Sequence, residues 1–183
     1  MLNIVNENID SEAIHSMTIQ NEKFIACLML TIVEKGEIEE KVLVNIRSDQ
    51  RTKENELVDM EKILTNLIDN LLTDSMEKTK IVMNIFIMAL EEDYNKNIFA
   101  DLINGTSYCL LLSGIPIKDV LCAISAEEVK LAYLIHENTV AYLDKSGKFE
   151  DVSGTVNDIF GAIDACIEKG NMLKDLVSKK IFG

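Results

Sequence analysis

Two clusters of carboxylates are the residues of this chain whose types and spacing could do chemistry. Glu127 and Glu128 are adjacent, and Glu91, Glu92 and Asp93 are consecutive. Paired carboxylates can serve as general acid and general base. The adjacent pair is better explained as a solvated acidic turn, and three consecutive carboxylates repel a phosphate group. We therefore predict no catalytic residue in either cluster.

Histidine and cysteine side chains offer no further catalytic or metal-binding pattern. His15 and His136 are the only histidines, and neither belongs to a His-x-x-x-His pair. The cysteines are widely spaced inside apolar segments, which is typical of ordinary reduced core residues in an intracellular protein: Cys27, Cys109, Cys122 and Cys166. We predict no metal site, no histidine-dependent triad and no cofactor.

The charge balance disfavours tight binding to nucleic acid. Eighteen Lys and Arg stand against 31 Asp and Glu, a net charge of −13, whereas binding to a phosphate backbone depends on clustered cations. One cationic cluster, interrupted by Asp49 and Glu54, is either a mixed solvated loop or a weak RNA-contact site: Arg47, Arg51 and Lys53. The solvated loop is the simpler interpretation, and we expect weak RNA binding by the isolated chain.

Length and apolar patterning indicate the elements that must position these residues. A chain of 183 residues predicts one domain over 1–183. No apolar run approaches the roughly 20 residues of a membrane-spanning helix, and the first ten residues do not resemble a secretory signal. Alternating and helical periodicities predict strands over 13–20, 23–34, 40–47, 81–90, 119–125, 130–135 and 139–143, and helices over 54–72, 96–112 and 155–180.

These elements predict an α+β (mixed α/β) fold with helices packed on a largely antiparallel mixed sheet. The first half is expected to form an antiparallel meander, and the strand over 81–90 to lie centrally, with both faces covered. The strand over 24–33 is apolar on both faces. Its second face therefore needs cover, from the last helix or from a partner, and we predict a subunit interface at Ile25, Cys27 and Met29.

One segment resembles a known family. Ile103-Asn104-Gly105-Thr106-Ser107 leads to Gly114-Ile115-Pro116-Ile117, and Asp119 to Ala126 follows. This segment resembles the small-residue helix, Gly-Ile-Pro turn and Cys-x-x-Ser-Ala strand of the RNase PH family and its exosome relatives. The resemblance implies an RNase PH-like (ribosomal protein S5 domain 2-like) fold from about Ala13 to Lys180.

The chain departs from active members of that family at three places. Their arginine-rich RNA loop is replaced by 48–55, their Gln-x-Asp-Gly turn by 90–97, and their catalytic Asp-Leu-x-Tyr segment with paired acids by 127–133. Phosphorolysis needs cations and donors that hold phosphate and stabilise the developing charge. The matching positions lack these groups, so we predict that the chain is not an enzyme.

The resemblance then implies a non-catalytic structural subunit of the eukaryotic RNA exosome core. Such subunits form a hetero-hexameric ring that channels RNA to an associated hydrolytic nuclease in 3′–5′ processing and degradation, including ribosomal RNA maturation. The implied partners are other RNase PH-type subunits, S1/KH cap subunits and RNA bound by the whole complex, without a membrane, in the nucleus (nucleolus) and cytoplasm. An active phosphorolytic 3′–5′ exoribonuclease or nucleotidyltransferase, and an unrelated acidic α/β interaction module, remain the alternatives.

Overall fold

The computed structural model describes residues 4–11, 14–34, 36, 40–49, 54–76, 78–91, 95–126, 129–145 and 152–182. They form two compact units, Met1–Tyr94 with Cys109–Lys118, and Asn95–Tyr108 with Asp119–Gly183. The order of strands and helices confirms the predicted α+β class, although the strands form two sheets. No helix among the described residues is long and apolar enough to cross a membrane.

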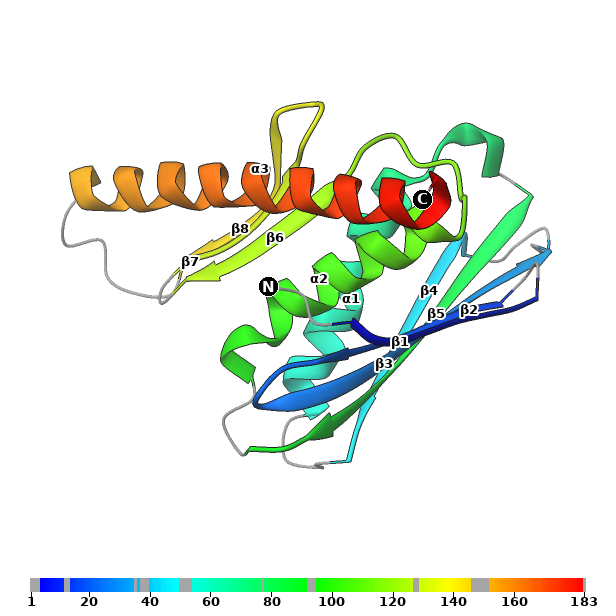
Figure 1. Cartoon of the computed structure of the whole chain (residues 1–183). Helices are drawn as coiled ribbons and strands as arrows, with labels where there is room; N and C mark the ends of the chain where they lie inside the picture. The colour runs from blue at the N-terminus through cyan, green and yellow to red at the C-terminus, as the bar shows by residue number, and fades with distance from the viewer. Residues whose placement is uncertain are drawn as a thin grey trace. The chain divides into compact units, whose positions relative to one another are not determined.

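The first unit is built on a five-stranded sheet of order β1-β2-β3-β5-β4 (Figure 1). Its strands are β1 (Ile4–Ser11), β2 (Ile14–Gln20), β3 (Phe24–Glu34), β4 (Val42–Ser48) and β5 (Thr79–Ala89). The pairs β1–β2, β2–β3 and β3–β5 are antiparallel, whereas β4 pairs with β5 in parallel. The predicted meander is therefore wrong for β4, because β5 inserts between β3 and β4. β1 was not predicted, since its sequence is largely polar.

Helix α1 (Glu54–Leu71) lies on the inner face of this sheet. The inner face is the side on which alternate strand residues such as Leu28, Val44 and Met83 are buried. Helix α1 packs against β4 and is followed by the short 3-10 helix η2 (Asp74–Met76). The predicted apolar stripe of α1 is buried at every position: Leu57, Met60, Leu64, Leu67, Ile68 and Leu71. This packing confirms that one face of β4 meets a helix layer.

The Gly-Ile-Pro segment ends helix α2 (Asn95–Leu112) and ties it to the end of α1. Gly114 has φ of 69°, the left-handed conformation that a glycine after a helix adopts without a Cβ clash. The Pro116 carbonyl then accepts the Thr73 backbone N–H at 3.3 Å, and the Lys118 N–H donates to Leu71 at 2.8 Å. The residues that carry the family resemblance here have a structural role.

The second unit contains a three-stranded antiparallel sheet, β6 (Leu121–Ala126), β7 (Val129–Leu134) and β8 (Thr139–Lys145). Helix α3 (Val152–Phe182), orange to red in Figure 1, packs on β6 and β7. Asn104 of α2 bonds both backbone groups of Ala123, donating to its carbonyl at 2.9 Å and accepting its N–H at 2.8 Å. The asparagine of the family-like segment thus fixes α2 to β6 at close range.

Candidate interaction face

The side of the five-stranded sheet opposite to the inner face is called the outer face. Strand alternation and register place the following described residues on it: Ser16, Thr18, Gln20, Ile25, Cys27, Met29, Thr31, Val33, Leu43, Asn45, Arg47, Lys80, Val82, Asn84, Phe86 and Met88. The predicted interface residues therefore share one face with Arg47, the one predicted RNA-contact residue that the structure describes.

Strand register aligns the centre of the outer face into two rows across four strands. The first row is Thr18, Cys27, Phe86 and Arg47, and the second is Ser16, Met29, Asn84 and Asn45. The Asn45 amide donates to the Asn84 side-chain oxygen at 3.0 Å, which orients both amides. The two rows line a groove of about 490 Å³. Apolar side chains thus occupy its centre, with polar side chains on either side.

Large apolar side chains on this face are exposed to solvent. Met29 is 45% exposed, Phe86 48% and Met88 46%. The prediction that the strand over 81–90 is covered on both faces is therefore wrong, although its central place in the sheet is confirmed by β5. Exposed apolar residues gathered on one face are typical of a protein interaction surface. The interface itself stays a prediction.

The outer face also differs in charge from the chain as a whole. Within the strands β2, β3, β5 and β4, its described residues include the cations Arg47 and Lys80 and no carboxylate. Asp49 follows the end of β4, where its carboxylate accepts the Ala89 backbone N–H at 3.2 Å. In a chain of net charge −13, four neighbouring strands whose described outer-face residues include no carboxylate are distinctive. Arg51 and Lys53 lie outside the described residues.

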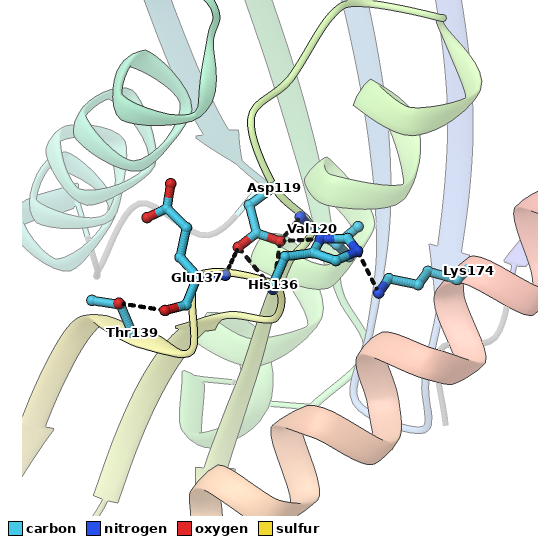
Figure 2. Close-up of polar contacts among 6 residues, drawn as sticks. All are labelled: Asp119, Val120, His136, Glu137, Thr139 and Lys174. Carbon is cyan, nitrogen blue, oxygen red and sulfur yellow. Dashed lines mark hydrogen bonds and ion pairs between the residues drawn. The ribbon is translucent and has the colours of Figure 1, made fainter.

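A second polar arrangement lies in the other unit and is called the Asp119 cluster: Asp119, Val120, His136, Glu137 and Lys174 (Figure 2). Asp119 precedes β6 and is 3% exposed. Its carboxylate accepts the backbone N–H groups of Val120 at 2.6 Å, His136 at 2.9 Å and Glu137 at 2.8 Å. The cluster therefore joins the segment before β6 to the turn between β7 and β8.

The imidazole of His136 extends this cluster to helix α3. Its Nδ1 lies 2.6 Å from Asp119 Oδ1, and its Nε2 lies 2.9 Å from Lys174 Nζ. A carboxylate accepts and an ammonium donates, so these partners place the proton on Nδ1 and leave Nε2 as acceptor. Figure 2 shows the resulting chain of contacts from Asp119 to Lys174.

Hydrogen bonding outweighs burial in setting the charge of Asp119. Burial acts to raise the pKa of its carboxyl, but the backbone N–H groups of Glu137, His136 and Val120 and the His136 ring lower it. The net result is a pKa below the ordinary value, so the carboxylate is ionised at neutral pH. The far side of the imidazole faces the Lys174 ammonium, and a protonated lysine is not a nucleophile. We interpret the Asp119 cluster as a structural clamp.

The pairing of Asp119 with His136 was not predicted from the sequence, because the two residues are 17 positions apart and no spacing pattern joins them.

The other candidate residues do not form a site in the described structure. His15 lies on the inner face, and its Nδ1 has no partner among the described residues. No group of three His, Cys, Asp or Glu suited to a metal occurs in the part of the chain that the structure describes. Glu92, Asp93, Glu127 and Glu128 lie outside that part.

The cysteines divide into three buried residues and one exposed residue. Cys109, Cys122 and Cys166 are buried, as predicted, whereas Cys27 is exposed on the outer face. The prediction of a core position is therefore wrong for Cys27, because an apolar strand does not itself reveal which face is covered. Burial raises the pKa of the Cys122 thiol to about 12 and that of Cys166 to about 11. Both thiols are protonated at neutral pH and poorly reactive.

Comparison with known proteins identifies the fold. The structure is similar to a crystal structure of rice (Oryza sativa) Rrp46, with a TM-score of 0.68 over 98% of this chain and 92% of that chain. The sequence identity is 11%, so the similarity establishes the fold and not the activity. No protein-family model matches the chain, and no characterised protein matches it by sequence. The chain thus has the RNase PH-like fold that its sequence predicted.

Proposed function

We propose that this chain is a structural, non-catalytic subunit of an RNA exosome core ring in the nucleus and cytoplasm. The fold similarity to rice Rrp46 over 98% of the chain is the observation that carries the proposal. The segment 143–151 also resembles the exosome subunit called ribosomal RNA-processing protein forty-six. The subunit would join other RNase PH-type chains, cap subunits and a hydrolytic nuclease, and would support 3′–5′ RNA processing and degradation, including ribosomal RNA maturation.

Three features support a role without catalysis. The arginine-rich loop, the phosphate-contacting turn and the catalytic acid segment of active family members are each replaced in this sequence. The Asp119 cluster directs its buried carboxylate to backbone N–H groups rather than to a free site. The outer face instead offers exposed apolar area, which suits assembly.

A phosphorolysis assay tests the absence of activity. The purified full chain, incubated with single-stranded RNA, inorganic phosphate and Mg²⁺, should release no nucleoside diphosphate, because groups that hold phosphate and stabilise the transition state are missing. Nucleoside diphosphate release that Asp93→Ala, Glu127→Ala or Glu128→Ala abolishes would support the phosphorolytic enzyme instead. Mock-purified material from cells lacking the chain is the control for contaminating nuclease.

A further inference from the structure

The edge strands of the two sheets differ in how their backbone groups are protected. An open edge offers N–H and C=O groups to a strand of another chain, and proteins usually block it with a side chain or a charge. In the middle of β4, the Glu61 carboxylate of α1 accepts the Ile46 backbone N–H at 2.6 Å. On β6, the Asn104 amide bonds both backbone groups of Ala123. The sequence of β1 contains two carboxylates. β8 is the remaining edge.

β8 lacks these protections over most of its length. Its only charged residues are the last two, Asp144 and Lys145, and the run from Thr139 to Leu143 is uncharged. No side-chain hydrogen bond to the backbone of Val140 or Leu143 occurs among the described residues. The side chain of Leu143 is 45% exposed and that of Val140 is 39% exposed. An exposed apolar strand at the edge of a sheet is a site where another strand can pair.

Strand register shows that the backbone of Leu143 faces this open edge. Ala123 bonds Asn104 on the side away from β7, so Ala123 and Ala132 form a non-hydrogen-bonded pair. The backbone groups of Ala132 therefore point toward Tyr142 of β8, and those of the next residue, Leu143, point away from β7. Leu143 thus presents an apolar side chain together with an N–H and a C=O group.

Backbone geometry and charge select the kind of partner. Only an extended chain can use the N–H and C=O groups of a sheet edge, which excludes a helix or an RNA strand. Glu137 and Asp144 are exposed near the two ends of β8, where cations of the partner can pair with them. A second copy of this chain would bring a further net charge of −13 and be repelled, whereas a basic segment is attracted.

We propose that β8 binds an extended segment of another protein as an added strand of the three-stranded sheet. Apolar side chains of the segment contact Val140 and Leu143, and its Lys or Arg residues pair with Glu137 and Asp144. The occupant is a linear segment and not a folded subunit, so this site is additional to the ring contacts of the proposed function and does not depend on them. A chain without catalytic groups would in this way attach a further protein.

Peptide titration against the full chain tests the proposal. The probe is a fluorescein-labelled peptide of alternating valine and threonine with two lysines at each end, and fluorescence anisotropy measures its dissociation constant. Leu143→Lys and Val140→Lys should each weaken binding by at least about tenfold, because each removes apolar contact and adds repulsion. Met172→Lys changes an exposed methionine of α3 and is the matched control. It should bind like the parent chain, and circular dichroism should show that every variant is folded.

Methylation of the peptide backbone separates strand addition from general apolar adsorption. A probe methylated on the nitrogens of its valine and threonine residues keeps its side chains but loses its backbone donors. It should bind at least about tenfold more weakly than the unmodified probe. Hydrogen exchange of the Leu143 amide should also slow when the unmodified probe binds, because that N–H gains an acceptor.

Charge reversal tests the ends of the site. A probe with glutamates in place of its lysines should bind the parent chain more weakly than the lysine probe. Asp144→Lys should reduce this preference for the lysine probe. A preference that Asp144→Lys leaves unchanged would show that the lysines pair elsewhere and would overturn the proposed orientation of the segment on β8.

The remaining outcomes also decide the proposal. A dissociation constant weaker than about 1 mM for the parent chain, or equal binding by Leu143→Lys or by the methylated probe, would overturn it. Self-association of the chain that Leu143→Lys abolishes would make a second copy the occupant. Loss of probe binding when RNase PH-fold partners are added would make a folded neighbour the occupant. None of these results bears on whether the chain is a ring subunit, which the composition of its complex tests separately.

Discussion

The outer face and the Asp119 cluster use polar groups in opposite ways. In the Asp119 cluster, one buried carboxylate is fully engaged by backbone N–H groups and an imidazole of its own unit. On the outer face, Arg47 lacks a described partner and Phe86, Met29 and Met88 are exposed. The paired polar groups of the cluster contribute to the stability of the fold, whereas the exposed residues of the outer face remain available for binding. Changes in the cluster should affect folding, and changes on the face should affect association.

The largest expected effect on stability is that of Asp119→Ala. This substitution leaves the buried backbone N–H of Val120 and the partly buried N–H groups of His136 and Glu137 without their acceptor, and a buried group left without a partner costs about 1–3 kcal/mol. We expect the free energy of unfolding to fall by roughly 3 kcal/mol or more, as measured by urea denaturation, with amide exchange rising in β6 to β8. Glu137→Ala is the control, since the backbone N–H remains. Equal stabilities of the two variants would contradict the clamp.

Protonation of the Asp119 carboxylate should reduce the stability of the fold in acid. Because the pKa of Asp119 is lower in the folded chain than its ordinary value of 3.8, its contribution is present above that value. The contribution is lost as the pH falls through the folded pKa. Urea denaturation between pH 7 and pH 2 should therefore show the difference between the parent chain and Asp119→Asn shrinking below pH 3.8. A difference that is constant over this range would assign another cause to the variant's instability.

A smaller effect is expected for two glycines of α3 with different surroundings. A Cβ at Gly170 would lie 2.5 Å from Cγ1 and Cδ1 of Ile135, whereas a Cβ at Gly161 meets nothing within 4 Å. Alanine favours a helix over glycine by about 1 kcal/mol. Gly161→Ala should therefore raise the free energy of unfolding, and Gly170→Ala should lower it by about 1–2 kcal/mol because overpacking outweighs propensity. Thermal melts that rise for both variants would show that α3 shifts freely on β7.

The smallest effect on stability is expected on the outer face. Met29→Asp removes little buried area, so the free energy of unfolding should change by about 1 kcal/mol or less. Release of the chain from its partners with an unchanged circular dichroism spectrum would sharpen the comparison. If Met29→Asp instead unfolds the chain, β3 is internal on both faces, and the interface must be sought on the strand over 40–47.

Local patterns in the sequence predicted much of this fold. The spacing of Leu57, Met60 and Leu64 was sufficient to place α1, and Gly114 marked the end of α2. The strand order of the five-stranded sheet was not predicted from these patterns, because the parallel pairing of β4 with β5 depends on contacts between distant segments. In a strand that alternates apolar and polar residues, the apolar side is the one that a helix layer covers. The uniformly apolar β3 has no such alternation, so its sequence does not show which side is covered.

The candidate face was also predicted in part. Ile25, Cys27 and Met29 were named together, and the structure places them on one side of β3. Their alignment with Phe86 and Arg47 follows from strand register, which a sequence without pairing information does not contain. The Asp119 cluster was missed for the same reason, since it forms only when a turn returns His136 to the start of β6.

Native mass spectrometry of the tagged chain, purified from its own cells under mild conditions, tests the central claim most directly. We expect one copy of this chain in a hetero-hexamer with other RNase PH-fold chains, and dissociation of that copy when Phe86 is replaced by Asp. A homo-oligomer of this chain alone that releases nucleoside diphosphates from RNA, or a monomer free of RNase PH-fold partners, would contradict it.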